Sequence, residues 1–178
     1  KASPHIACAN ALRMDWNDLL PAEKCSYVLG NPPFVGAKEK TEEQREDIDF
    51  IWHDVNGHRI LDYVTNWYRK ACDYINTFPV ECTFVSTNSI TMGEQVSVLW
   101  ADLFQRGIHI NFAHRTFAWS SEAKGKAHVH CVIIGFSKNR SKLPVIYTYN
   151  TPKSEPEIEN VSIINPYLIE GENKEVFE

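Results

Sequence analysis

Residues 26–34 read SYVLGNPPF, and this stretch decides the fold class. Residues 26–29 predict a short strand, and the Gly-Asn-Pro-Pro sequence that follows ends it, because proline has no backbone N–H to donate to a sheet. The chain must therefore leave the sheet at Asn31. Ligands of open α/β folds bind at this carboxyl end of the strands. We therefore expect a binding site at residues 31–34.

Short apolar runs alternate with helical patterns around this stretch, which is typical of an α/β fold. Further strands are predicted at residues 5–8, 80–86, 108–113, 127–136 and 145–149. Apolar side chains at three- and four-residue spacing predict helices over residues 61–75 and 96–103. Residues 38–54 carry seven acidic and three basic side chains, which indicates an exposed helix or a mobile loop. After residue 150 the composition indicates a linker or a docked tail.

The composition limits the class of protein. A chain of 178 residues makes one domain, and 43% hydrophobic residues exclude disorder for most of it. No apolar run approaches the roughly 20 residues that cross a bilayer, and residues 1–10 lack the apolar stretch of a signal peptide. We expect a soluble, cytoplasmic protein without a membrane partner, or a piece of one. The five widely spaced cysteines predict buried, reduced thiols.

The charge is unevenly distributed. The net charge of -5 argues against a nucleic-acid partner, but residues 151–178 alone carry two lysines and seven glutamates, so residues 1–150 are neutral. Residues 106–142 hold seven basic side chains and one acid. This segment is either a basic patch or an ordinary set of solvated strand ends. The candidates for DNA contact are Arg115, Trp119, Lys124 and Lys126, and the alternative for Trp119 is packing on the core.

The four residues Asn31, Pro32, Pro33 and Phe34 have a definite chemical use. A rigid turn fixes the Asn31 side chain and the Pro32 carbonyl, and these two oxygens can accept both hydrogens of an exocyclic amine. The Phe34 ring can stack on the heterocycle that carries the amine. The group can thus hold an amino-purine or amino-pyrimidine by its NH2. The alternative is a structural proline turn with a buried phenylalanine.

Five blocks of sequence carry a resemblance to a known family. They are NALRMDW (10–16), NPPFVGAKEK (31–40), LDYVTNWYRKA (61–71), FVSTNSITMGEQV (84–96) and FAHRTFAWSSEAKGKAHVHCVIIGF (112–136). In this order they resemble the methylase part of bacterial fused type II restriction-modification enzymes. The residues Asn31, Pro32, Pro33 and Phe34 resemble the catalytic motif of N6-adenine DNA methyltransferases, which use S-adenosylmethionine (SAM). The resemblance implies a Rossmann-like sheet with an antiparallel final strand, and double-stranded DNA with a flipped adenine as substrate.

One part of the family pattern is absent. The family binds SAM through a glycine-rich turn and an acidic residue, but the eight glycines here include no G-x-G. The chain therefore resembles the C-terminal part of the domain, beginning at the family's third strand. By resemblance, the Asn10 amide and the Ala11 backbone contact the adenine of SAM. The alternative for Asn10 is a turn-forming residue after a strand.

The resemblance also divides the chain. It implies a partial catalytic domain over residues 1–150 and, over residues 151–178, a linker toward a target-recognition domain. The neighbour of the strand at residues 5–8 is missing, which predicts either self-association through that edge or displacement of the first ten residues.

Three weaker patterns and two rival functions remain. His128 and His130 share one face of a strand without a third ligand, so we predict no metal site. The polar residues 86–89 either line the pocket or cap a helix, and Asp62 lies beside the pocket or supplies charge to a helix N-terminus. The rival functions are a protein-glutamine methyltransferase and a non-enzymatic DNA- or protein-binding α/β module.

Overall fold

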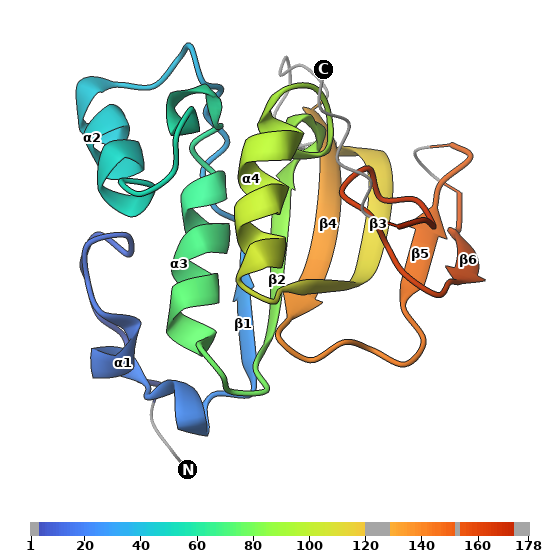
Figure 1. Cartoon of the computed structure of the whole chain (residues 1–178), viewed down its shortest axis with the longest axis horizontal. Helices are drawn as coiled ribbons and strands as arrows, with labels where there is room; N and C mark the ends of the chain where they lie inside the picture. The colour runs from blue at the N-terminus through green and yellow to red at the C-terminus, as the bar shows by residue number, and fades with distance from the viewer. Residues whose placement is uncertain (1–3, 120–128, 152–153, 173–178) are drawn as a thin grey trace.

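The computed structural model describes residues 4–119, 129–151 and 154–172. These residues form a six-stranded sheet, and helices α3 and α4 lie against one of its faces (Figure 1). The strands are β1 (Tyr27–Gly30), β2 (Glu81–Thr87), β3 (His109–Trp119), β4 (Val129–Ser137), β5 (Val145–Thr148) and β6 (Glu157–Asn160). The α-helices are α1 (Trp16–Leu19), α2 (Glu42–Ile51), α3 (Thr65–Ile75) and α4 (Gln95–Gln105). Short 3-10 helices are η1 (Ala22–Lys24), η2 (His58–Ile60) and η3 (Asn88–Thr91).

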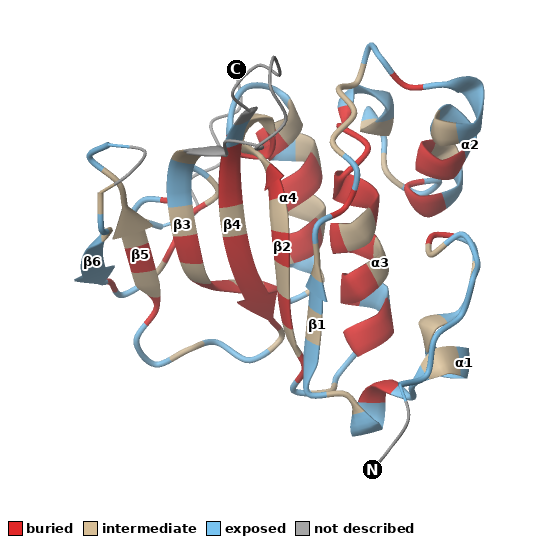
Figure 2. Cartoon of the chain, turned by 180° about the vertical axis from the view of Figure 1, so that it is seen from behind, coloured by how far each residue is buried: buried red, intermediate tan, exposed pale blue. Residues whose placement is uncertain are grey.

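The sheet is mixed, with the strand order β1-β2-β4-β3-β5-β6. Strand β1 is parallel to β2, and β3 is parallel to β5. Strand β4 lies between β2 and β3 and is antiparallel to both. The predicted antiparallel strand is therefore present, although the two short strands β5 and β6 follow it. Seen from behind in Figure 2, β4 is buried along most of its length, as its nearly continuous apolar sequence predicts.

The register brings the carboxyl ends of β1, β2 and β3 to one edge of the sheet. Gly30 pairs with Phe84, and Thr87 and Phe117 both pair with Cys131. A Cβ on Gly30 would lie 3.1 Å from the Phe84 ring, so glycine is the residue that fits without displacing this ring. The strand end that leads into Asn31 is therefore pressed against β2.

A cluster of aromatic rings joins the helices to the sheet. Tyr68 of α3 is fully buried and stacks on Phe136 of β4, with ring centroids 5.2 Å apart. It also meets Phe84 and Trp100 edge to face. The Tyr68 hydroxyl lies 2.7 Å from the Ser86 Oγ, so its polar end is paired inside the core. This cluster fixes α3 and α4 relative to β2 and β4.

The N-terminal strand prediction is wrong. Residues 4–10 are exposed and form no strand in the structure, and Ile6 is 82% exposed. A strand needs a neighbour for its backbone hydrogen bonds, and residues 5–8 pair with no other described residue. Of the two outcomes predicted for this segment, the sheet edge for self-association is not formed, and residues 4–10 lie outside the sheet. All five cysteines are free, but Cys8 is exposed, contrary to the prediction of buried thiols.

Two further segments take shapes that the sequence left open. The acidic segment contains α2, which begins with a capping box between Thr41 and Gln44. Part of the segment after residue 150 is docked, because β6 pairs with β5 and the side chains of Val161, Ile164 and Leu168 are buried. Among the described residues, no helix is long and apolar enough to span a membrane.

Candidate active site

The candidate site is the loop that follows β1. Residues 31–36 have no regular secondary structure. Asn31 is exposed, Pro32 is buried, and Phe34 is partly buried against the core. Within the described part of the chain, the Asn31 amide makes no hydrogen bond. Its carbonyl oxygen is thus free to accept a hydrogen from a ligand, while the buried Pro32 fixes the turn that presents it.

The segment before α3 holds the exit of this loop. The Tyr63 backbone N–H donates to the Val35 carbonyl at 2.9 Å. The Ala37 backbone N–H donates to Asp62 Oδ1 at 2.9 Å, and Lys40 Nζ donates to the Leu61 carbonyl at 2.5 Å. Three successive residues, 61–63, therefore bind three positions of the loop. Burial lowers the pKa of the Lys40 ammonium, although the Asp62 charge opposes this shift.

Asp62 also contacts η3, the 3-10 helix that follows β2. The Ser89 hydroxyl forms a short hydrogen bond to Asp62 Oδ2 and lies 2.8 Å from Thr87 Oγ1. The Asp62 backbone N–H donates to Gln95 Oε1 at 3.0 Å. Helix α3 begins at Thr65, and the hydrogen bonds of the Asp62 carboxylate go to the loop and to Ser89. The polar end of β2 and the loop after β1 therefore meet at one carboxylate.

The predicted cofactor residues lie on a second, neighbouring loop. Asn10 Oδ1 accepts the Leu12 backbone N–H at 2.9 Å, which is the turn-forming role that the sequence left as an alternative. The Asn10 amide nitrogen lies 3.5 Å from Asp47 Oδ2, and the Ala11 carbonyl accepts the Trp16 indole N–H at 2.8 Å. Asn10 remains exposed, so its amide is both oriented and accessible.

Asp47 joins the two loops and was missed by the sequence interpretation. This buried carboxylate accepts the Tyr63 hydroxyl at 2.7 Å and the Arg13 Nε at 2.6 Å. Burial raises the pKa of Tyr63, and the bond to Asp47 raises it further. Tyr63 in turn holds Val35 through its backbone. The loop of Asn10 is thus linked to the loop of Asn31 through α2 and residue 63.

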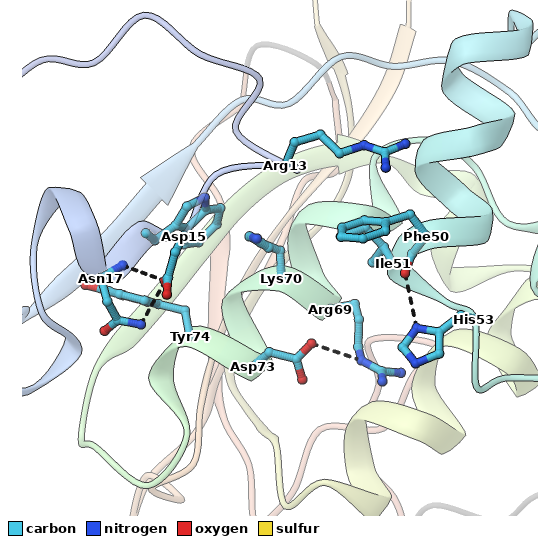
Figure 3. A pocket seen from close by; sticks show the side chains of 11 residues that line it. Arg13, Asp15, Asn17, Phe50, Ile51, His53, Arg69, Lys70, Asp73 and Tyr74 are labelled. Atoms are coloured by element: carbon cyan, nitrogen blue, oxygen red, sulfur yellow. Dashed lines mark hydrogen bonds and ion pairs between the residues drawn. The ribbon is translucent and has the colours of Figure 1, made fainter.

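A cavity of about 750 Å³ adjoins the loop of Arg13 (Figure 3). The Arg13 guanidinium lies 4.4 Å from the centroid of the Phe50 ring, and Trp16 meets Tyr74 edge to face at 5.5 Å. Lys70 also lines the cavity, whereas none of the residues 31–34 does. This cavity is therefore separate from the candidate active-site loop.

The predicted DNA-contacting residues lie on or after β3. Arg115 is exposed where the β3–β4 register shifts, near the edge that carries Asn31. Trp119 ends β3 and its backbone pairs with Val129, whereas Lys124 and Lys126 lie outside the described residues. The neighbouring His114 stacks on Tyr147 with ring centroids 4.2 Å apart, and burial lowers its pKa. Arg115 is the one charged candidate that the structure describes, and it lies on β3 toward the end of the sheet that carries Asn31.

The His128 residue also lies outside the described residues. In the parts of the chain that the structure does describe, no three His, Cys, Asp or Glu side chains come together as a metal site would require.

Comparisons with known proteins give the family of the chain. Residues 1–148 match the family described as MmeI, DNA-methyltransferase domain. The chain is 42% identical over 171 residues to DNA methyltransferase A of Bacillus subtilis, covering 94% of this chain and 19% of that protein. The structure superposes on the type IIL restriction-modification enzyme MmeI, solved in complex with DNA, with a TM-score of 0.93 and 51% identity.

The chain spans about a fifth of the length of these two relatives. The chain is covered to 98% by MmeI but spans 23% of that enzyme. A type I restriction-modification methyltransferase subunit from Streptococcus thermophilus, 15% identical, covers 83% of this chain with a TM-score of 0.50, which shows a shared fold alone. The family match over residues 1–148 is the decisive finding. The chain belongs to the MmeI DNA-methyltransferase domain family.

Proposed function

We propose that this chain is the catalytic part of a SAM-dependent N6-adenine DNA methyltransferase within a restriction-modification enzyme. The observation that carries the proposal is the state of Asn31. Its amide is exposed and without a hydrogen-bond partner among the described residues, at the carboxyl end of a sheet strand. The partly buried Phe34 ring lies three residues further along the same loop.

The loop suits the reaction through its acceptors. A target adenine rotated out of the duplex would donate its two amine hydrogens to Asn31 Oδ1 and to the Pro32 carbonyl. Accepting both hydrogens directs the nitrogen lone pair out of the ring plane, toward an electrophile. The Phe34 ring would stack on the base, and its anchorage in the core would keep that stack in place.

The residues present fit one part of a cofactor site. Asn10 Oδ1 has a second lone pair beyond its bond to Leu12, and the side chain is exposed, so it can accept an adenine amine hydrogen beside the Ala11 backbone. When bound, SAM supplies an electrophilic methyl group. We propose that its remaining contacts come from parts of the parent enzyme outside these 178 residues. The absence of a G-x-G turn and the 23% share of MmeI support this division.

Double-stranded DNA is the proposed partner. The similar enzyme MmeI is solved in complex with DNA. Arg115 is exposed near the edge that carries Asn31, where a phosphate of the bound duplex would lie. Residues 106–142 carry six more basic side chains than acidic ones, which favours an anionic partner such as DNA.

The test is methyl transfer by the intact parent enzyme. Labelled methyl groups are transferred to duplex DNA in a single turnover, and the modified nucleoside is identified by mass spectrometry. We expect N6-methyladenine, and Asn31→Ala should lower the rate by about 100-fold or more, the scale of one preorganised polar contact, with little change in DNA affinity. Asn56→Ala is the matched control, because Asn56 is also exposed and lies in a different loop.

Phe34→Ala separates base capture from chemistry. Losing the stack should weaken capture of the flipped base by roughly 1 to 3 kcal/mol. A mispaired target adenine is easier to flip and should partly restore the rate. A product methylated at cytosine, or a methyl group found on protein glutamine, would contradict the proposal. So would an Asn31→Ala enzyme that keeps the wild-type single-turnover rate.

A further inference from the structure

We propose that Asp62 is a positioning residue for the methyl-transfer loop, and this inference rests on the proposed function. Its carboxylate connects the exit of the Asn31 loop to Ser89 of η3, the 3-10 helix that follows β2. Asp62 itself lies on neither element and precedes α3. It reaches the reacting groups only through the loop, so it is not a catalytic residue.

The first argument is how completely the carboxylate is used. Asp62 is 6% exposed. Oδ1 accepts the Ala37 backbone N–H, and Oδ2 accepts the Ser89 hydroxyl. A buried carboxylate is costly unless hydrogen bonds compensate for its lost hydration. Here both compensating donors belong to elements that border the Asn31 site.

The second argument is that the attachment is held on several sides. The neighbours of Asp62 bind the same loop, because Tyr63 N–H donates to Val35 and Lys40 donates to Leu61. Gln95 of α4 holds the Asp62 backbone N–H. The buried Lys40 ammonium also supplies a positive charge near the carboxylate. Asp62 therefore has a fixed place from which it can fix Ala37.

The third argument concerns leverage on the chemistry. Ala37 lies six residues after Asn31, with Pro32 and Pro33 restricting the backbone between them. We expect a shift of Ala37 to reach the Asn31 amide and the Pro32 carbonyl through this short, restricted segment. A misplacement of about 1 Å costs on the order of 100-fold in rate. Losing the carboxylate should thus affect the rate more than the binding of either substrate.

The conservative variant provides a specific check. In Asp62→Asn the remaining Oδ1 still accepts the Ala37 N–H. The new amide nitrogen can donate to Ser89 Oγ, because the Ser89 hydroxyl can direct its own hydrogen to Thr87 Oγ1. Asp62→Ala has neither interaction. A positioning role therefore predicts that asparagine restores function and that alanine does not.

The experiment compares these variants in the intact parent enzyme. We expect Asp62→Ala to lower the single-turnover methyl-transfer rate by about 10- to 100-fold, with the dissociation constants of SAM and DNA changed less than about threefold. Asp62→Asn should keep the rate within about threefold of wild type. Asp73→Ala is the control, because Asp73 lies on the far part of α3 and pairs with Arg69 of the same helix and with Arg106 after α4.

A second measurement does not depend on activity. Hydrogen exchange of the peptide 31–40 should be about tenfold faster in Asp62→Ala and unchanged in Asp62→Asn and Asp73→Ala. If Asp62→Ala does not fold, Ser89→Ala replaces it, because this variant removes only the hydrogen-bond partner of Asp62 Oδ2. In Ser89→Ala, hydrogen exchange of the peptide 31–40 should be faster, and the methyl-transfer rate lower, by about three- to tenfold.

The outcomes separate the two proposals. Unchanged exchange in the 31–40 peptide of the alanine variant, or a rate per folded enzyme equal to wild type, would overturn the role of Asp62. A wild-type enzyme that transfers no methyl group to adenine would overturn the proposed function. If the wild-type enzyme is inactive but hydrogen exchange of the peptide 31–40 is faster in Asp62→Ala than in wild type, Asp62 still orders the loop.

Discussion

Gly135 offers a test of the sheet register that can be worked out from distances. It pairs with Phe112 on the neighbouring strand, and a Cβ at residue 135 would lie 2.0 Å from Phe112 Cε1 and 2.3 Å from Cδ1. The ring therefore covers the glycine, an arrangement that stabilises glycine within a strand. In Gly135→Ala the ring must move off the sheet. Overpacking of this kind costs about 1–3 kcal/mol, against a gain of roughly 0.5–1 kcal/mol from alanine's lower backbone freedom.

A double-mutant cycle isolates this contact. The chain should lose about 1–2 kcal/mol in Gly135→Ala, measured by urea unfolding, and each kcal/mol corresponds to roughly 2–4 °C in melting temperature at this size. In a Phe112→Ala background the clashing ring is gone, so Gly135→Ala should be neutral or stabilising. Equal destabilisation in both backgrounds would refute the register on which the position of β3 at the site edge depends.

Three further outcomes are expected. Arg69→Met should lower the free energy of unfolding, measured by urea titration, by about 3 kcal/mol, because the Arg69 side chain is 3% exposed and binds Asp54 and Asp102. The control Arg59→Met changes a side chain that is 81% exposed and should alter the free energy of unfolding little. Burial lowers the pKa of His114 below 6.5, so the unfolded chain binds this proton more readily than the folded chain. The free energy of unfolding should therefore fall as the pH drops below about 6.5. NMR titration gives the pKa, and His114→Gln should reduce this pH dependence. Calorimetry on the isolated chain should show no micromolar SAM binding, because most cofactor contacts are proposed to lie elsewhere.

Apolar pattern predicted the elements whose side chains face the core. The strand predicted at residues 80–86 is β2 (Glu81–Thr87), and the one at 127–136 is β4 (Val129–Ser137). The helix predicted over 61–75 starts four residues late, at Thr65, because residues 61–63 bind the loop instead. Periodicity reports burial, and Leu61 is buried without being helical, so the pattern alone could not distinguish the two.

The apolar pattern could not predict the elements and contacts that depend on backbone or polar side-chain pairing. Strand β6 has the sequence EIEN and is exposed at every position, so only its partner β5 makes it a strand. The contacts of Asp47 and Asp62 depend on tertiary neighbours that sequence spacing does not reveal. The start of helix α2 could have been predicted from the sequence, because Thr41 and Gln44 have the spacing of a capping box.

Because β4 lies between β2 and β3, the sheet can be completed during translation only after β4 has been synthesised. A ribosome delivers β2 and β3 before β4, yet these two strands meet only through β4. The nascent chain therefore carries β2 with an open edge until residue 137 has left the exit tunnel. Such edges pair readily with other chains. Slow codons between β3 and β4 would prolong that exposure, whereas slow codons after β4 would follow closure of the gap, so misassembly during translation should depend on where the pause falls.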